Sequence, residues 1–458
     1  MREMLIAYPG ASQLRYDIKE SKPKFHGNQT ISVGSGSMLD LLPPRNIVDR
    51  HINLYLDSFE TFYRVLHVPS FREQYKQFWD VPGQAKLDFV VIVRLMVAAT
   101  SCIDNQKYRS SNLDSSLARN AACEWIAACE AWLQQQSQKH VTLLYMQVQC
   151  ILHIAKQMQS YKAKRTWTAA GTLMSLAISK GTHRNADILN QQQRGDDARR
   201  VSIFDQEMRR RLWSTIAEME MQSALERGMP SCLPDLNVDC GAPTNCHDAS
   251  FSPMTETRLS SQPMVYFTRS SYQCYISKSW HLRQRTLSLI NGKFSPNFQE
   301  TQELDQAILQ ALDDIPAWDS QEAVLPSSLL QLQFYQLLLW LHQVNDNSES
   351  DQSKYNYSKL MHVRAAKAII DIHEALCTKG HQVLTILRQD VLSAALSICY
   401  DHEMAKTIGK AFNLCIPYFD TDAPRSNFGA RGLIPKRGRS SKIPREGRAN
   451  TCGQDSNH

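Results

Sequence analysis

Apolar residues recur at three- and four-residue steps along most of the chain from residue 47 onward, which is the spacing of one face of an α-helix. The first such stripe consists of Val48, Ile52, Tyr55, Phe59, Phe62 and Leu66. It predicts a helix that ends near Pro69, because proline lacks the N–H that a continuing helix needs. Further helical patterns cover residues 86–101, 115–135, 141–159, 162–180, 264–290, 299–313, 327–344, 356–377 and 381–411.

Patterns typical of β-strands are scarce, and no fixed repeat period appears. The chain is therefore predicted to be all-α, with one large irregular helical domain of about ten helices. Residues 1–46 are predicted to be a flexible N-terminal segment, and residues 47–416 the helical domain. Residues 228–263, rich in Pro, Cys, Asp, Asn and Ser, are predicted to separate two lobes. Residues 417–458 are predicted to be a basic, disordered tail.

The stretch FDQEMRRRLWSTIAEMEMQSALERGMPS, residues 204–231, is the most informative helical pattern. Asp205 is the predicted N-cap, and Glu207 is expected in the first turn, where the helix dipole favours a carboxylate. The helix is expected to end near Arg227, just before Gly228 and Pro230. Its apolar stripe consists of Met208, Leu212, Thr215, Ile216 and Met219, with Trp213 beside it.

Three consecutive arginines, Arg209, Arg210 and Arg211, precede Leu212 and Trp213. Consecutive residues on a helix are about 100° apart, so these side chains diverge and cannot share one surface that faces a nucleic-acid groove. We expect at least one of them to lie along the packed face and to pair with a buried carboxylate or with carbonyls at a helix end. A phosphate or DNA site is the alternative.

Composition is that of a soluble globular protein, with 43% hydrophobic and 21% charged residues. Residues 421–458 carry +5 of the formal charge of +6, because they contain eight Lys or Arg and three Asp or Glu. The helical body is therefore nearly neutral and lacks the general basic character of nucleic-acid-binding domains. In the tail, Lys436, Arg437 and Arg439 form a basic cluster that is a candidate nuclear-import signal.

Twelve scattered cysteines include no pair two residues apart, which argues against a disulfide framework and against standard zinc motifs. No apolar run reaches the roughly 20 residues of a membrane helix, and the N-terminus lacks a secretory core, so an intracellular protein with reduced thiols is expected. Weaker metal candidates are the helical pairs Cys150/His153 and Cys399/His402. A loop set consists of Cys232, Cys240, Cys246 and His247.

Enzyme signatures are missing from the sequence. No nucleophile elbow, phosphate-binding glycine loop, HExxH or EF-hand pattern occurs, and the carboxylate pairs Asp196-Asp197 and Asp313-Asp314 fit a solvated surface. We predict no catalytic residues and no resident metal. An enzyme with an unfamiliar helical active site and a helical scaffold for protein interactions are the alternatives.

Several motifs, in order, resemble the fungal-specific transcription factor domain, the middle homology region of fungal zinc-cluster regulators. YLDSFETFYRVLHVPSF at 55–71 is similar to the opening segment of that domain, and residues 143–185 resemble the helix pair that follows it, with Trp167, Gly171 and a final His183-Arg184. The most specific motif contains Glu207, Arg209, Arg210, Arg211, Leu212, Trp213, Gly228 and Pro230. The resemblance covers about residues 47–345, with departures at Lys180, Thr182 and Ser214.

The resemblance implies a helical regulatory domain of a nuclear protein that controls transcription by RNA polymerase II. Its implied partners are the transcription machinery, related full-length regulators, a second copy of the chain or a small-molecule effector. Family members bind DNA through a cysteine-rich zinc module, whereas residues 1–46 contain no cysteine. We therefore expect no zinc cofactor in this chain, only weak or indirect DNA binding, and no membrane association.

Overall fold

The computed structural model describes residues 42–81, 86–104, 112–136, 142–188, 201–233, 238–292, 297–345 and 352–398. The first half of these residues forms α4 (Arg45–Ser58), η1 (Phe59–Thr61), α5 (Val68–Asp80), α6 (Leu87–Asp104), α7 (Asn112–Gln135), α8 (Leu143–Met158), η4 (Ala163–Arg165), α9 (Thr166–Ser179) and α11 (Ile203–Arg227). The second half forms η6 (Asp248–Ser250), α12 (Ser271–Lys278), α13 (Trp280–Ile290), α14 (Phe298–Asp313), η7 (Gln321–Ala323), α15 (Val324–Asn345), α16 (Gln352–Thr378), α17 (Val383–Leu387) and α18 (Asp390–Ile398).

The all-α prediction is confirmed, because the described residues contain helices and no strand. They form 13 helices of seven or more residues, which exceeds the ten or so that were expected. Part of the excess arises where one continuous apolar pattern covers two helices, and part from α5, which begins where the first predicted helix was expected to end. Residues 264–290, predicted as a single helix, form α12 and α13 with a break at Ser279, whose hydroxyl donates to the Ile276 carbonyl at 3.0 Å.

The prediction that the first helix ends near Pro69 is wrong. Helix α4 ends at Ser58, and Pro69 instead lies in the first turn of α5, where a missing N–H costs nothing. His67 is the N-cap of α5, and its side chain accepts a hydrogen bond from the Ser70 amide. Phe62 and Leu66 are buried as the apolar stripe predicted, but they lie in an irregular connection rather than on a helix.

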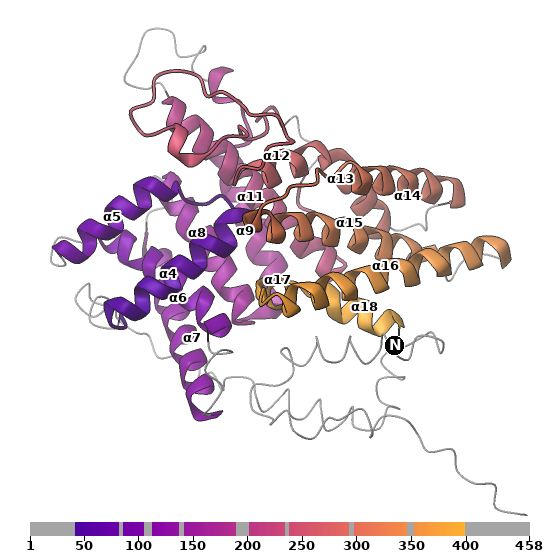
Figure 1. Ribbon diagram of the computed structural model, residues 1–458, viewed down its shortest axis with the longest axis horizontal. Helices are drawn as coiled ribbons and strands as arrows, with labels where there is room; N and C mark the ends of the chain where they lie inside the picture. Colours follow the sequence, from indigo (N-terminus) through magenta and orange to yellow (C-terminus); the bar gives the residue numbers. More distant parts are fainter. Residues whose placement is uncertain are drawn as a thin grey trace, which may run out of the picture. The chain divides into compact units, whose positions relative to one another are not determined.

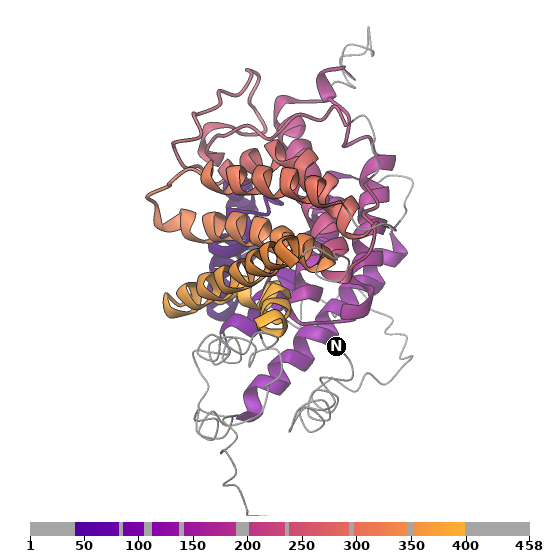
Figure 2. The same cartoon turned by 90° about the vertical axis from the view of Figure 1, so that its right-hand side faces the viewer.

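Helix α11 is the central helix of the body. Of its 25 residues, 17 are buried, and they occupy every side of the helix, which is typical of a helix surrounded by others. Helices α8, α9 and α12 pack against it. In Figure 1, α4 to α8 lie to one side of α11 and α13 to α16 to the other. Figure 2 shows α13 to α16 side by side, and α15 packs on both α14 and α16.

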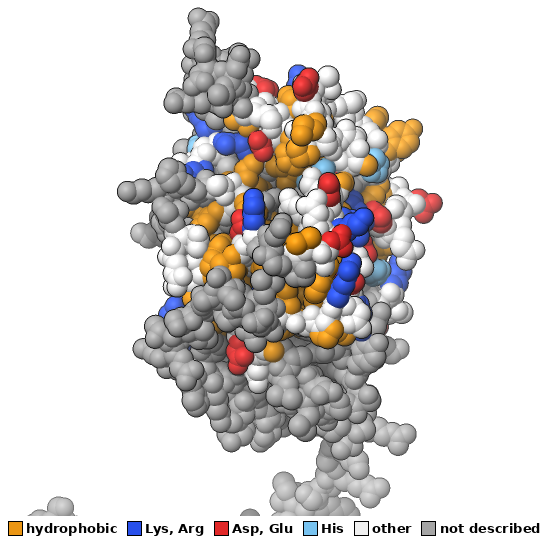
Figure 3. All heavy atoms as spheres, turned by 90° about the vertical axis from the view of Figure 1, so that its left-hand side faces the viewer, with side chains coloured by type: hydrophobic (Ala, Val, Ile, Leu, Met, Phe, Trp, Pro, Cys, Tyr) orange, Lys and Arg blue, Asp and Glu red, His pale blue; other side chains and the backbone are white. Residues whose placement is uncertain are grey.

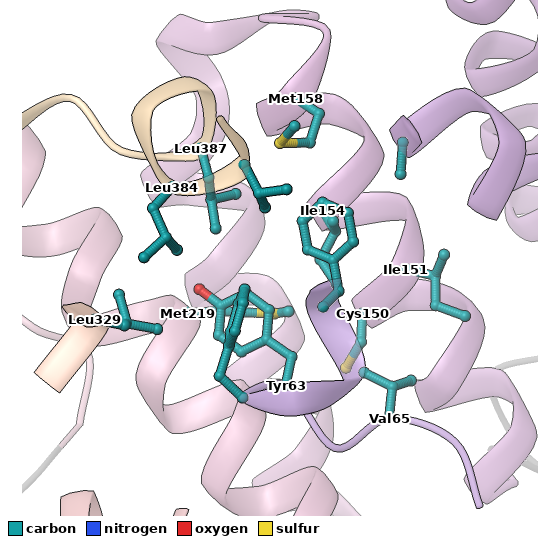
Figure 4. Packing of buried hydrophobic residues seen from close by; sticks show 14 of the residues in the cluster. Tyr63, Val65, Cys150, Ile151, Ile154, Met158, Met219, Leu329, Leu384 and Leu387 are labelled. Carbon is teal, nitrogen blue, oxygen red and sulfur yellow. The ribbon is translucent and has the colours of Figure 1, made fainter. Parts of the chain in front are cut away.

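Most of the buried apolar side chains form one connected cluster that runs from Val48 in α4 to Ile398 in α18. Figure 4 shows part of it, where residues of α8, α11, α15 and α17 meet around Tyr63. The cluster includes residues on both sides of the 228–263 segment, such as Met219 and Leu329. The two-lobe boundary in that segment stays a prediction.

The ends of α11 agree only in part with expectation. The helix ends at Arg227, as predicted, and Gly228 follows in the left-handed conformation with φ +60°. The N-cap is Ser202, not Asp205: the Ser202 hydroxyl accepts from the Asp205 amide at 3.0 Å and donates to the Asp205 carboxylate at 3.0 Å. Asp205 therefore takes the first-turn place expected for Glu207, which lies two residues further on and is buried.

None of the described helices has the length and apolar content that a bilayer span requires. Residues 1–41 and 399–458 lie outside the described residues. They contain most of the predicted N-terminal segment, the end of the 381–411 pattern, the whole predicted tail and the Lys436, Arg437 and Arg439 cluster.

Candidate functional site

The arginine motif lies in a buried network of charges at the N-terminal half of α11. Arg211 is fully buried, its Nε donates to Glu207 Oε1 at 2.9 Å, and its Nη1 donates to Asp248 Oδ1 at 2.7 Å. Its guanidinium also lies over the ring of Phe251, 4.8 Å from the centroid. Burial disfavours a charged guanidinium, but Asp248 and Glu207 outweigh it and raise the pKa of Arg211 above its ordinary value. Arg211 is therefore the inward arginine.

A second buried arginine, Arg64, reaches the same carboxylate from the connection after η1. Its Nη2 donates to Asp248 Oδ1 and its Nη1 to the Glu60 carbonyl. Asp248 Oδ2 accepts from the Val68 amide at 3.0 Å. Burial alone would raise the pKa of Asp248, but Arg64 and Arg211 hold it well below its usual range. Asp248 thus joins three segments: the start of α5, α11 and the segment that contains η6.

Glu207 and His67 attach the 238–251 segment at further points. Besides Arg211, Glu207 accepts from the Thr244 hydroxyl at 2.9 Å and from the Thr244 amide at 3.1 Å. His67 Nε2 lies 3.0 Å from the Asp248 carbonyl oxygen, and its ring packs against Phe251 with centroids 4.7 Å apart. Glu60 lies at the edge of this network, 3.8 Å from Arg64 Nη1, and burial raises the pKa of its carboxyl to about 8.

Arg209 and Arg210 point in other directions, as their spacing predicted. Arg209 Nη2 donates to the Gly181 carbonyl at 2.8 Å, at the C-terminal end of α9. Arg210 is only partly buried and pairs with Glu207 Oε2 at 3.1 Å. The expectation that at least one arginine pairs with a buried carboxylate or with helix-end carbonyls is confirmed, because Arg211 does the first and Arg209 the second.

The remaining motif residues divide between the two ends of α11. Leu212 and Trp213 are buried near the network, and the Trp213 ring lies 5.9 Å from that of His183. Gly228 and Pro230 lie at the opposite end of α11, and the Pro230 carbonyl accepts from Trp167 Nε1 at 3.0 Å. The eight residues are thus not one site. They determine how α9, α11 and the segments at each end of α11 pack together.

The metal candidates that the structure describes do not form a ligand set. Among the residues that the structure describes, no group of three or more His, Cys, Asp or Glu side chains is arranged to hold a metal ion. Cys246 Sγ lies 3.8 Å from Arg211 Nη2, whereas Cys232 packs on Gly171. Cys150 and His153 are buried, and burial lowers the pKa of His153 to about 4. Cys399, His402, Asp196 and Asp197 lie outside the described residues, and Asp313 and Asp314 are exposed.

The best-formed cavities of the described body are small. The larger is about 90 Å³ and the next about 10 Å³. Sites for drug-sized ligands usually have about 300–1,000 Å³. The larger cavity contains one carboxylate, Glu226, and no histidine. An enzyme active site would be a closed pocket lined by several titratable groups. Neither of these two cavities has that form.

Asp248 and Arg64 are the residues that sequence reasoning missed. Arg64 gave one usable signal, because it is a charge between the apolar residues Tyr63 and Val65. Asp248 gave none, since it lies in an irregular segment and its partners are 37 and 184 residues away.

A comparison of the sequence with models of known protein families shows which family the chain belongs to. The family model described as "Fungal specific transcription factor domain" matches residues 52–318, from α4 to just beyond α14. The chain belongs to this family. The match includes both partners of each central ion pair, Arg64–Asp248 and Arg211–Asp248.

Similar proteins are named as fungal transcription factors. Transcription factor opdR of Penicillium oxalicum is 32% identical over 257 residues, which cover 56% of this chain and 30% of opdR. Transcription factor asR3 of Sarocladium schorii is 31% identical over 242 residues, covering 53% of this chain and 27% of asR3. The pyrrolocin cluster transcription factor fsdR, from an unspecified fungal species, is 24% identical over 385 residues, covering 77% of this chain and 47% of fsdR. The chain thus spans less than half the length of each of these three relatives. No solved structure matches it significantly.

Replacing Arg211 with alanine is expected to lower the free energy of unfolding by about 3–5 kcal/mol, because Asp248 and Glu207 lose a buried partner. The matched change Arg210→Ala removes a partly exposed partner of the same Glu207 and should cost about 1 kcal/mol or less. Urea unfolding of both variants measures the difference. Equal losses in the two variants would contradict the assignment of Arg211 as the inward arginine.

The raised pKa of Glu60 predicts a dependence of stability on pH. The folded state keeps a proton on Glu60 up to about pH 8, whereas an unfolded glutamate releases it near 4.3. The folded chain therefore binds more protons than the unfolded chain between about pH 5 and 8, and this group makes stability fall as pH rises through that window.

In Glu60→Gln this fall should become shallower, while Glu256→Gln, at an exposed position, should leave it unchanged. Urea unfolding midpoints at half-unit pH steps test the point. An identical pH profile in Glu60→Gln and the unmodified chain would show that Glu60 ionises normally in the folded state.

Proposed function

We propose that this chain regulates RNA polymerase II transcription in a fungus, and that the genes it controls form a biosynthetic cluster. Membership of the fungal specific transcription factor domain family over residues 52–318 carries the proposal. The name of the relative fsdR, a cluster transcription factor, supports the choice of target. We further propose that the domain has no catalytic role.

We propose that DNA recognition is supplied from outside these 458 residues. The three motif arginines donate to acceptors within the chain, which leaves them poorly placed to contact phosphates. On the face drawn in Figure 3, basic and acidic side chains are interspersed among apolar ones rather than gathered into a basic patch. Proposed partners are the transcription machinery, a related full-length regulator or a second copy of the chain.

We also propose that the helical domain needs no zinc, and that zinc belongs to the DNA-binding modules of other family members. A metabolite as large as typical ligands is a poor fit to a cavity of about 90 Å³.

The chain alone is expected to give no sequence-selective complex with DNA in a gel-shift titration at physiological salt. Fused to an unrelated DNA-binding domain, it should change expression of a reporter that carries the binding site of that domain, relative to the DNA-binding domain alone. An Arg211→Ala fusion should lose the effect, and Arg210→Ala should keep it, because the first breaks the buried network. Tight, selective binding by the unfused chain, or a fusion without effect on the reporter, would contradict the proposal.

Nuclear localisation is proposed to depend on the cluster of Lys436, Arg437 and Arg439. Alanine at all three positions should shift a fluorescent fusion of the chain from the nucleus to the cytoplasm. The matched control replaces three exposed basic residues of the body, Lys164, Arg165 and Lys379. A fusion that stays nuclear after loss of the cluster would rule out this import signal.

A further inference from the structure

A basic loop at the end of α8 differs in charge from the rest of the body. Residues 156–165, KQMQSYKAKR, contain Lys156, Lys162, Lys164 and Arg165 and no acidic residue. The rest of the chain before the tail offers little net charge, because the tail accounts for +5 of the total formal charge of +6. The loop is therefore a local concentration of positive charge on a nearly neutral body.

Two arginines from other helices extend this group of cations. Arg119 Nη2 in α7 donates to the Gln159 carbonyl at 3.1 Å, and Arg227 Nη2 at the end of α11 donates to the Ala163 carbonyl. Both acceptors are backbone carbonyls of the loop, so neither bond neutralises a guanidinium. Basic side chains from α7, α8, α11 and the connection to α9 thus gather around the loop.

Few carboxylates balance these cations. Glu130 in α7 pairs with Lys156 Nζ at 2.6 Å and with Lys162 Nζ at 2.8 Å. Lys164 and Arg165 are exposed and form no ion pair with the residues that the structure describes. Both are therefore available to an anionic group that approaches from solvent.

A second carboxylate near the loop, Glu226, is already engaged. Its Oε1 accepts from Gln222 Nε2 at 2.8 Å and from the Gln389 amide at 3.3 Å, and its carboxyl interacts with the buried guanidinium of Arg388. With Glu130 and Glu226 both counted as ionised, the six cations and two carboxylates still leave a surplus of +4. This surface therefore attracts anionic ligands.

The cavity of about 90 Å³ lies next to these cations and is lined partly by the loop. Its lining residues are Gln157, Ser160, Ala163, Thr166, Glu226, Ile386, Leu387, Gln389 and Leu392. Three of them, on α17 and α18, are the aliphatic residues Ile386, Leu387 and Leu392. All the lining residues except Leu387 are at least partly exposed, so the cavity lies at the surface. An apolar recess therefore lies beside exposed cations.

The volume of the cavity suits one small aliphatic side chain. An engineered cavity of about 150 Å³ binds benzene, which has six carbons, so about 90 Å³ holds roughly three or four carbons. Valine and leucine side chains are of this size. Protein interfaces often obtain most of their binding energy from an anchor of this kind, seated in a pocket with a polar rim.

The loop is held in place before any ligand binds. Ser160 and Lys162 have φ of 51° and 50°, in the left-handed region that residues other than glycine rarely adopt. The bonds from Lys162 to Glu130 and from Arg227 to the Ala163 carbonyl maintain this conformation. A surface that is already ordered loses less conformational entropy when it binds a ligand.

We propose that the basic loop and the adjacent cavity bind an acidic peptide segment of a partner protein. The peptide inserts one aliphatic side chain among Ile386, Leu387 and Leu392, and its carboxylates pair with Lys164 and Arg165. The same charge attracts nucleic acid, but the cavity lining includes no aromatic ring on which a base could stack. The aliphatic recess therefore favours the peptide. The surface stands independently of the proposed role in transcription.

The test is the fluorescence anisotropy of two labelled peptides titrated with the full chain at low salt. The first peptide has one leucine between three acidic residues on each side, and the second has serine in place of leucine. The leucine peptide should bind about tenfold more tightly, because only leucine gains from burial in an apolar recess. The basic tail attracts both peptides equally, so it leaves this ratio unchanged. Equal binding of the two peptides, no binding, or tighter binding of an oligothymidylate of equal charge would overturn the proposal.

Variants connect the binding to this surface. Lys164→Glu with Arg165→Glu should weaken binding of the leucine peptide about tenfold, because two attractive charges become repulsive. The matched control, Lys76→Glu with Lys86→Glu, makes the same change in charge at exposed lysines outside the loop and should have little effect. Leu392→Trp fills the recess and should remove the preference for leucine over serine. Unchanged leucine-peptide binding in the Lys164 and Arg165 double variant would place the peptide elsewhere and contradict the proposal.

Discussion

The sharing of Asp248 between Arg64 and Arg211 is the interaction on which the rest of the site depends. Both guanidiniums are fully buried, and both donate to the same oxygen, Oδ1. Taking such charges out of water is costly, so the arrangement is stable only when every member is present and well placed. It determines where the irregular segment with η6 lies, since that segment has few large apolar residues of its own to bury.

Charge balance explains why a third carboxylate can lie in the same place. The two fully buried arginines, Arg64 and Arg211, are matched by Asp248 and Glu207, so an ionised Glu60 would exceed the positive charge of these buried groups. Glu60 meets this constraint by keeping its proton, as its raised pKa of about 8 indicates. The buried part of the network is then neutral, which is the least costly state for charges that are removed from solvent.

The sequence predicted the helical body well. Most helices bury one apolar face, so their apolar residues recur at the helical spacing along the chain. The prediction failed at two helix boundaries. Pro69 predicts a helix end but is equally suited to a first turn, and Asp205 predicts an N-cap although Ser202 precedes it with the same chemistry. No periodicity marks these choices, since each depends on a few local hydrogen bonds.

The site could be predicted only in part. The divergence of the three arginines followed from helix geometry, and the inward pairing followed from the apolar stripe beside them. The identity of the partner did not follow, because Asp248 lies 37 residues from Arg211 in a segment without regular structure. The choice among Arg209, Arg210 and Arg211 as the inward residue depends on where α9 ends and where the 238–251 segment crosses α11, which are tertiary facts.

Helix α11 connects the charge network to the cavity, and its other contacts limit how it can do so. Between Arg211 and Glu226, which are about 22 Å apart along the helix at 1.5 Å per residue, it makes several further buried polar contacts, two of which show the constraint. Glu218 pairs with Arg283 at 2.8 Å, and Gln222 bonds to Gln336 at 3.0 Å. A shift of one residue would rotate these groups by about 100° and break all of them together. The helix is therefore fixed in register, and any change that passes between its ends must move the elements packed around it, such as α8, α9 and α12, rather than α11 itself.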